Sequence, residues 1–582
     1  MRKNKKNIKL PLTISFVLYA IAIFGGAESL KKTFSQTQFE TAYKITYDIG
    51  ESGETLVTQE IEITNKDDDV LVTVYSFILS QMNIYDVSGF DTAGQLEVDV
   101  KRDGENNRTT ISAPLKDQVI GKGRSSKINI SYKTSDLANK VGEIWNVNLP
   151  KPSNLEEIAK YEVIIKVPQA FGPQIYIAPT PSVTGEENNK TVYSYSKQDI
   201  ENKSITATFG KNQILNFELK YDLLNNTFLP RRQSIALPPD IAKHQQIYFS
   251  SIEPKPTFLK KDTDGNIMAT FWIKPNQAVQ VIVRGSAKIF GNQISPEMGG
   301  KMHEIPSDLK KLYTKADTYW EVENSKIKDL ALELFDPKKN VAQNAYEAYK
   351  YVVENLEYDT EITQENTIQR HGALKALTQK GAWACMEFTD LFIALTRAMG
   401  IPARELNGFA FSEGESIVPT PVDFNTGDML HAWAEFYDPN FGWVQVDPTW
   451  GNTSGIDYFT KLDTNHLAFV VKGVSSEEPY PAGAYRLDTN QKQINVDFAE
   501  KQIDFEPKLE FKKAIPWNLL KILQGKRRYV VTHKEGPILY GVGGENSKRI
   551  IFPFSKESVY LERGADVLEY RDFGGNLEKI SM

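Results

Sequence analysis

Alternating apolar and polar residues dominate the first third of the chain. Within residues 40–210, apolar side chains recur at every second position in several runs, of which Tyr43–Ile49, Ile128–Tyr132 and Tyr161–Val167 are the clearest. Successive side chains of a strand point to opposite faces, so this period predicts strands with one buried face. Turn signals that contain glycine separate the runs. We therefore expect an antiparallel β-sandwich-like domain over residues 40–210.

The same alternation continues in a second β-rich domain, which we place at residues 211–300. Its strand candidates include Ile214–Tyr221 and Ala278–Val283. The turn Asp262–Asn266 has the composition of a calcium loop, but the twelfth position of that loop is Ile273 rather than an acid. Strands rather than helices flank the turn, so we expect a hairpin turn and no calcium site.

Short strand patterns return in a small C-terminal β-rich region, residues 480–582. The segment Pro516–Ile522 and the basic run Lys526–Arg528 precede most of these strands. A solvated face explains such a run. Contact with a membrane surface is the alternative, for which three charges are few.

A helical period replaces the alternation in residues 305–475. Apolar residues at three- and four-residue steps predict helices over Ile327–Leu334 and Ala342–Leu356. The same spacing continues after Cys385, where the apolar positions are Phe388, Leu391, Phe392, Leu395 and Met399. A glycine and a proline follow this face and are expected stop signals. Cys385 therefore lies in the first turn of a predicted helix.

Cys385 is the only cysteine among the 582 residues, which excludes an intrachain disulfide and a zinc site built from several cysteines. A thiol in the first turn of a buried helix lies near unpaired backbone N–H groups and the positive end of the helix dipole. Both stabilise the thiolate, which is the nucleophilic form. A lone cysteine is more often a small buried apolar residue, so its role depends on the groups that it meets.

Two strand-like runs downstream of this helix carry a histidine and a carboxylate. The runs 431–437 and 443–447 flank a five-residue turn. If the first and last residues of the turn pair, His431 becomes a diagonal neighbour of Asp447 on one face of the sheet. A buried helix that docks there would bring Cys385 to the imidazole. The base then takes the thiol proton and the acid orients the base, as nucleophilic catalysis requires.

The segments around these residues resemble the transglutaminase-like superfamily, a group of papain-like fold that contains transglutaminases and microbial thiol hydrolases. The resemblance covers about residues 335–460, within a catalytic domain at 305–475, and rests on ALKALTQKGAWAC, RAMGIPAR, ELNGF, HAWAEFY and GWVQVDPTW. It implies that Cys385 is the nucleophile, His431 the base and Asp447 the orienting acid. It also implies a reaction that needs no metal or other cofactor, because the triad carries the chemistry itself.

One position departs from the family pattern. The family usually has glycine two residues before the cysteine, and this chain has Trp383. The indole N–H of Trp383 is a candidate donor to an oxyanion, with packing or lining of the cleft as the alternative. Trp433, which the hairpin register places opposite Asp447, is a second candidate for the oxyanion site or the cleft. The backbone N–H of Cys385 is the donor that needs no special side chain.

The N-terminal 27 residues carry an export pattern. Five lysine or arginine residues in Met1–Leu10 precede Leu10–Ala27, which has no charge. We expect a cleaved signal peptide or, alternatively, an uncleaved membrane anchor over residues 1–27. In both cases the remainder is exported and is secreted, periplasmic or attached to the cell surface. The net charge of −7 leaves no basic field for binding nucleic acid.

These patterns predict an exported α+β multidomain protein with N-terminal β-sandwich-like domains, a papain-like transglutaminase core and a small C-terminal β region. In the function that we expect, Cys385 attacks an amide bond of a peptide or protein, cell-wall peptide included, and water or an amine takes the resulting thioester. The polar insertion Phe411–Asp428 is either a substrate-binding lid or a solvated loop. The alternative function is a non-catalytic cell-surface protein that retains the fold and binds peptides or cell-wall material.

Overall fold

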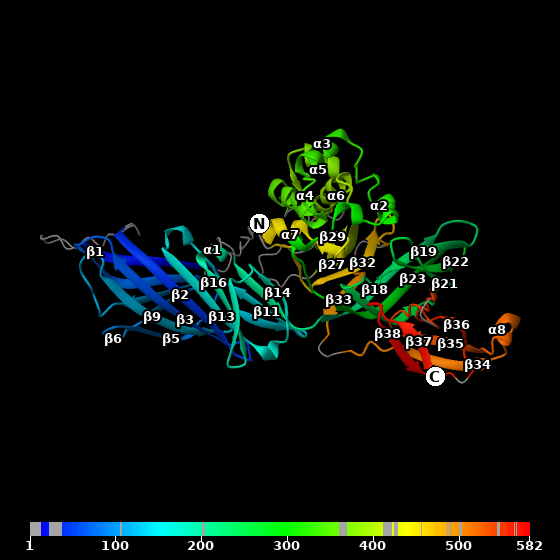
Figure 1. The fold of residues 1–582 in the computed structure, drawn as a ribbon, viewed down its shortest axis with the longest axis horizontal. Coiled ribbons are helices and arrows are strands. Elements are labelled where there is room, and N and C mark those ends of the chain that lie inside the picture. The colour runs from blue at the N-terminus through cyan, green and yellow to red at the C-terminus, as the bar shows by residue number, and fades with distance from the viewer. Residues whose placement is uncertain are drawn as a thin grey trace, which may run out of the picture. The chain divides into compact units, whose positions relative to one another are not determined.

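The chain divides into two compact units, Met1–Lys211 and Asn212–Met582, and each is described by itself (Figure 1). The structure is a computed structural model. It describes residues 13–22, 38–104, 107–200, 204–359, 369–410, 422–423, 429–454, 457–485, 487, 491–499, 503–543, 547–563, 565 and 567–582.

The first unit consists almost entirely of strands. Strand β2 (Phe39–Ile49) buries every second side chain, as the alternation predicts, and most strands pair antiparallel with their neighbours. An eight-stranded sheet has the order β15-β16-β13-β2-β3-β9-β5-β6, in which only β13 and β2 run parallel. The bounds of its other strands are β3 (Thr55–Asn65), β5 (Tyr85–Asp91), β6 (Gly94–Gln95), β9 (Ser125–Thr134), β13 (Lys160–Pro168), β15 (Val183–Glu187) and β16 (Lys190–Ser196).

Two smaller sheets complete this unit, and side chains from all three meet in one hydrophobic core. Their orders are β12-β1-β4-β8-β7 and β10-β11-β17-β14. The predicted β-sandwich-like character is confirmed. The remaining elements are β1 (Thr13–Ala22), β4 (Val70–Ser80), β7 (Asp99–Asp103), β8 (Arg108–Pro114), β10 (Ala138–Val141), β11 (Ile144–Leu149), β12 (Lys151–Pro152), β14 (Gln174–Ala178), α1 (Lys197–Ile200) and β17 (Ile205–Phe209).

Strand β1 falls within the predicted export segment and pairs antiparallel with β4. Residues 1–12 and 23–27 of that segment lie outside the described residues. No helix among the described residues is long and apolar enough to span a bilayer. Export, with either a signal peptide or an anchor at residues 1–27, stays a prediction.

The second unit begins with two sheets, ordered β20-β23-β18-β33 and β19-β22-β21. Strand β33 comes from the C-terminal part of the chain, so the predicted regions 211–300 and 480–582 share a sheet. The bounds are β18 (Gln213–Asn225), β19 (Arg231–Leu237), β20 (Gln245–Glu253), β21 (Phe258–Lys261), β22 (Ile267–Ile273), β23 (Gln277–Ile289), β33 (Ile494–Phe498), β34 (Lys508–Ala514), α8 (Leu519–Leu523), β35 (Arg527–Glu535), β36 (Lys556–Leu561), β37 (Val567–Arg571) and β38 (Leu577–Ser581).

The turn at residues 262–266 is the predicted hairpin turn, because β21 and β22 pair antiparallel on either side of it. Its Asn266 side chain donates to the Val471 carbonyl and accepts from the Val471 N–H, both at 2.7 Å. Gln245 makes the same pair of bonds with Ala468, at 2.9 and 2.8 Å. Two side-chain amides thus satisfy backbone groups of β32 (His466–Lys472) and attach the β-rich part to the helical part.

Helices α3 to α6 gather on one side of a sheet ordered β28-β29-β27-β32, with β30 paired to β29 (Figure 1). The predicted helices at 327–334, 342–356 and after Cys385 are confirmed. The bounds are β24 (Asn292–Gln293), α2 (Ser307–Tyr313), α3 (Ser325–Leu334), α4 (Val341–Asn355), β25 (Glu357–Tyr358), α5 (Ala373–Thr378), β26 (Ala382–Trp383), α6 (Cys385–Ala398), β27 (Ala403–Ala410), β28 (Val422–Asp423), β29 (Met429–Asp438), β30 (Gly442–Val446), α7 (Pro448–Ser454) and β31 (Lys461–Leu462).

Helix α6 is enclosed on all sides, and a buried cluster of charges fixes it to β27. Arg370 donates to Asp390 of α6 at 2.9 Å and to Glu405 of β27 at 2.6 Å. The indole N–H of Trp320 donates to the same Asp390 at 3.0 Å. The predicted lid or loop at 411–428 lies outside the described residues except for β28.

Candidate active site

Cys385 is the first residue of α6, and 4% of its surface is exposed. The carboxylate of Glu387 accepts the backbone N–H of Ala384 at 3.2 Å and that of His371 at 2.7 Å. Burial raises the pKa of Glu387, and the backbone N–H groups of His371 and of Glu387 itself oppose that rise. The carboxylate thereby ties the segment before the helix to its first turn and fixes the backbone at Cys385.

A side-chain hydrogen bond docks the start of α6 onto the neighbouring strand. The hydroxyl of Thr389 donates to the Ala432 carbonyl of β29 at 3.1 Å. The Cys385 side chain packs against Ala432, which follows His431 in the chain. The helix therefore delivers the thiol to the strand that carries the histidine.

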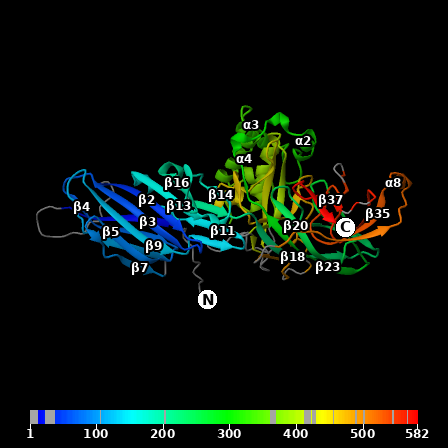
Figure 2. The same ribbon diagram turned by 60° about the horizontal axis from the view of Figure 1, so that its bottom comes forward.

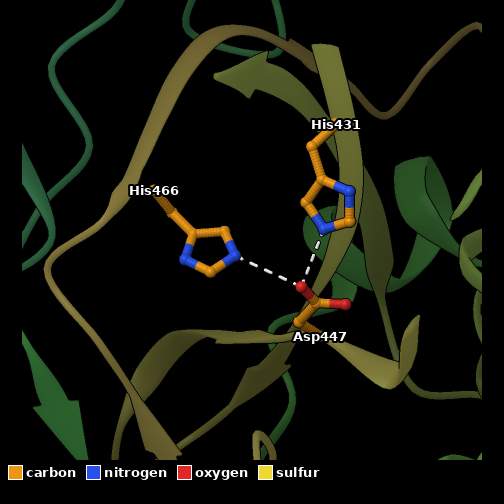
Figure 3. A group of neighbouring side chains, drawn as sticks. All are labelled: His431, Asp447 and His466. Atoms are coloured by element: carbon orange, nitrogen blue, oxygen red, sulfur yellow. Dashed lines mark hydrogen bonds and ion pairs between the residues drawn. The ribbon is translucent and has the colours of Figure 1, made fainter. Parts of the chain in front are cut away.

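The hairpin has the predicted register. Asp438 pairs with Gly442, and the ladder runs to the pair of Ala434 and Val446. Asp447 is the next residue, so it lies diagonal to His431 on the same face. The Nε2 atom of His431 and the Oδ2 atom of Asp447 are 2.7 Å apart, and a dashed line marks this contact in Figure 3.

His431 and Asp447 each shift the pKa of the other toward its charged form. Burial lowers the pKa of an imidazole, but the charge and hydrogen bond of Asp447, together with a hydrogen bond to Cys385, outweigh burial and raise the pKa of His431 to about 9. Burial raises the pKa of a carboxyl, yet His431 and His466 hold the pKa of Asp447 far below its usual range. At neutral pH the site therefore holds an imidazolium and a carboxylate.

A second histidine contacts the same carboxylate, and the sequence patterns did not single it out. The Nε2 atom of His466 lies 3.2 Å from Oδ2 of Asp447, and its Nδ1 atom lies 2.8 Å from Oδ1 of Asp463 (Figure 3). Burial alone would lower its pKa, but the two carboxylates raise the pKa of His466 to about 9. Because each ring nitrogen faces a carboxylate, both donate and His466 is an imidazolium. The sequence signal was an acid three residues before a histidine at a strand start.

Aromatic rings enclose the two histidines. The rings of Trp433 and Trp450 stack on His431, with centroids 5.9 and 5.5 Å away. The backbone N–H of Trp450 donates to Oδ1 of Asp447 at 3.0 Å. These rings exclude water, so the charges interact in a medium of low dielectric constant.

Trp433, the second candidate for the oxyanion site or the cleft, packs beside the imidazole of His431. Its ring is completely buried, and its indole N–H donates to Oε1 of Gln445 at 3.1 Å. In this arrangement the indole N–H already has a partner. The role of Trp433 at the oxyanion site or in the cleft stays a prediction.

Trp383 is nearly buried at the end of β26, and its ring meets His371 edge-on at 5.8 Å. Its backbone carbonyl accepts the N–H of Asp359 at 3.0 Å. These contacts hold the segment that enters the helix. The role of its indole N–H as an oxyanion donor stays a prediction.

The donor atoms of His431, Asp447 and His466 lie within 4.8 Å of one another, a set that could hold a metal ion. Both imidazoles already contact the shared carboxylate oxygen directly, so each Nε2 atom has a partner without an ion. A metal here would also withdraw His431 and Asp447 from the thiol. The expectation of no cofactor stays a prediction.

Comparison with known proteins identifies a family for the helical part of the second unit. Residues 328–448 match the model of the Transglutaminase-like superfamily. An uncharacterized protein of Bacillus subtilis (strain 168), YebA, is 26% identical over 221 residues, which are 33% of this chain and 29% of that protein. An uncharacterized protein of Haemophilus influenzae is 28% identical over 131 residues, 21% of this chain and 35% of that protein. The matches thus span about a third of these relatives.

Among solved structures, this chain is similar to a proposed cysteine protease from Cytophaga hutchinsonii. The identity is 18%, the match covers 50% of this chain and 99% of that one, and the TM-score is 0.32. A likeness at this level adds no argument about the site. The family match and the helix, hairpin and sheet around Cys385 lead to one conclusion: residues 328–448 of this chain form a domain of the transglutaminase-like superfamily.

Proposed function

We propose that this protein is an exported thiol enzyme that acts on amide bonds of peptides or proteins, with Cys385 as nucleophile, His431 as acid and base, and Asp447 as the group that orients His431. One observation carries the proposal. The buried imidazole of His431 is bonded to Asp447 through Nε2 at 2.7 Å, and the Cys385 side chain packs against Ala432, the residue that follows His431. A scaffold has no physical need for this chain of groups.

The arrangement supports a two-step reaction. The Cys385 thiolate attacks the amide carbonyl carbon, and the C–N bond breaks as the imidazolium of His431 protonates the leaving amine. The acyl group remains on sulfur as a thioester. Neutral His431 then takes a proton from water or an amine, the nucleophile attacks the thioester, and the thiolate leaves. Asp447 stays ionised and stabilises each imidazolium that forms.

Water as acceptor makes the protein a peptidase or amidase, and a lysine amine makes it a cross-linking enzyme. The first step and the thioester that it forms are the same for both acceptors. Peptides that contain glutamine and peptides of the cell wall are the substrates to try first.

A second candidate function is a non-catalytic peptide- or cell-wall-binding protein. The low exposure of Cys385 (4%) and Trp383 (7%) favours it, because a closed cleft admits no substrate. In that case the β-rich parts would provide the binding surface.

Trapping of the thioester tests the proposal. The protein is incubated with glutamine peptides or cell-wall peptides and hydroxylamine, which converts a thioester to a hydroxamate that mass spectrometry detects. We expect hydroxamate from the natural chain and none from Cys385→Ala. Equal yields from both chains, or binding of the peptides without any hydroxamate, would reject the enzyme and favour the binding protein.

A further inference from the structure

The hairpin of β34 and β35 ends in an exposed apolar segment. Helix α8 lies at its tip and projects beyond the sheet in both views (Figures 1 and 2). Six large apolar side chains occur within nine residues there, and between 43% and 86% of the surface of each is exposed. We call this set the apolar tip: Ile515, Trp517, Leu519, Leu520, Ile522 and Leu523.

The apolar tip does not pack on its own sheet, since no residue of α8 is buried. No other segment of this length among the described residues exposes so many large apolar side chains. Soluble proteins rarely leave contiguous apolar surface in water, and such surface marks a place of contact.

Positive charge surrounds the apolar tip. The eighteen residues from Phe511 to Arg528 contain no acid, and their basic residues are Lys512, Lys513, Lys521, Lys526, Arg527 and Arg528. Only Lys526 among these forms an ion pair with a carboxylate within the described residues, Glu562 at 3.1 Å. The chain as a whole carries a net charge of −7, so the local charge of this hairpin is opposite in sign to that of the whole chain.

The Arg528 side chain positions the aromatic member of the tip. The guanidinium carbon of Arg528 lies 3.4 Å from the ring centre of Trp517, and Arg528 also donates to the Ile515 carbonyl at 3.1 Å. Arg528 therefore holds the start of the apolar tip in place and puts a positive charge beside the indole ring of Trp517. A tryptophan next to a cation is the arrangement found at the boundary between lipid headgroups and acyl chains.

The charge around the tip favours a bilayer over a protein groove. At about 100° per residue, Leu519, Leu520, Ile522 and Leu523 lie within about 160° of the helix circumference and Lys521 lies on the opposite side. A short helix with an apolar face and a basic residue opposite it fits the boundary between lipid headgroups and acyl chains. The six basic residues and the absence of acids from Phe511 to Arg528 suit the anionic headgroups of a bilayer.

We propose that the apolar tip and its basic residues dock the second unit onto membranes that contain anionic lipids. The apolar side chains enter the acyl boundary, and the lysines and arginines bind the headgroups. This surface is independent of the proposed chemistry at Cys385 and of the segment at residues 1–27. On this proposal the basic run contacts a membrane surface rather than forming only a solvated face.

Hydrogen exchange with and without lipid vesicles tests the proposal on the full chain. With vesicles of phosphatidylcholine and phosphatidylglycerol, we expect amides 515–526 to exchange at least ten times more slowly, and vesicles of phosphatidylcholine alone to protect them much less. This readout is local, so binding through the N-terminal segment does not imitate it. Unchanged exchange at 515–526 would overturn the proposal.

A variant pair gives the second measurement. Leu519→Asp with Leu520→Asp should lower partitioning onto anionic vesicles about ten-fold. The matched control is Phe228→Ser with Leu229→Ser, since these side chains form an exposed apolar pair outside the tip and lie in the turn between β18 and β19. Equal partitioning of the tip variant and the natural chain would contradict membrane docking. Concentration-dependent dimers that the tip variant abolishes, without lipid protection, would assign the tip to a second copy instead.

Discussion

The carboxylate of Asp447 serves two imidazoles. Its Oδ2 atom accepts from His431 at 2.7 Å and from His466 at 3.2 Å, and Oδ1 accepts a backbone N–H. His466 is in turn held by Asp463. Its ring nitrogens are both bonded to carboxylates, so we regard it as a positioning residue that acts through Asp447.

Replacement of His466 tests that role. His466→Gln removes a positive charge that competes for Asp447, so the carboxylate acts on His431 alone and raises the pKa of His431 further. We expect the basic limb of the pH–rate profile to move to higher pH and kcat to fall about ten-fold, as for other outer partners of a functional carboxylate. The measurement is kcat/KM and kcat between pH 5 and 10. A fall in kcat with an unmoved limb would show a merely structural role.

Both buried imidazoles also make stability depend on pH. Their pKa values rise from 6.5 to about 9 on folding, so the folded chain keeps protons that the unfolded chain releases between these values. The resulting stabilisation is fully present below pH 6.5 and is lost as pH rises through about 9, at about 3 kcal/mol per imidazole.

Urea unfolding at pH 6 and at pH 9.5 measures this loss. The natural chain should lose several kcal/mol between the two conditions. The double variant His431→Gln, His466→Gln should lose much less. Equal losses would mean that these histidines do not carry the dependence.

At the scale of elements, the register of one hairpin and the entry of one helix position the site. The hairpin register followed from the turn, and the position of Cys385 followed from the spacing of apolar residues after it. His466 escaped prediction because β32 reaches Asp447 only through pairing with β27, which local patterns do not encode. The alternation of apolar and polar residues predicted the sheet face on which Trp433 lies, but it could not predict the hydrogen bond from its indole N–H to Gln445. From the sequence alone, the apolar segment near Trp517 resembles a buried core segment, and only the structure shows that it is exposed.

The bond between Thr389 and Ala432 tests the docking of α6. Thr389→Val keeps the shape but leaves a buried carbonyl with one partner fewer, so we expect a loss of about 1–3 kcal/mol and slower reaction of Cys385 with haloacetamides. Urea unfolding and labelling rates measure the two effects.

Thr396→Val is the matched control on the same helix. The Thr396 hydroxyl is buried and has no hydrogen-bond partner among the described residues, so its removal should be neutral or stabilising. If both variants lose the same stability, the hydroxyl bond of Thr389 does not hold the helix.

At the scale of the whole chain, the transglutaminase-like domain and the β-rich parts of the second unit form one body. Phe409, Leu467 and Phe469 from the transglutaminase-like part are buried in a core with Phe249 and Ile494 from the β-rich parts. The sequence placed boundaries between these regions because their periods differ. The period of the apolar residues indicates whether a segment is a helix or a strand, but it does not indicate which segments pack in the same core.

Fragments test this shared core. We expect residues 212–582 to fold and to retain the labelling profile of Cys385. Residues 305–475 alone should unfold readily, because three large apolar side chains lose their cover at about 1.5–3 kcal/mol each. Circular dichroism and labelling rates check both fragments. A stable, reactive 305–475 fragment would contradict the single body.

The pH dependence of Cys385 alkylation by a haloacetamide tests the central claim most directly. An unperturbed thiol ionises near pH 8.5. We predict rapid labelling of the natural chain down to about pH 6 that is lost in His431→Gln, because the imidazolium stabilises the thiolate. His303→Gln, at an exposed histidine, should leave the profile unchanged. Slow labelling that rises only above about pH 8 and ignores His431 would contradict the account.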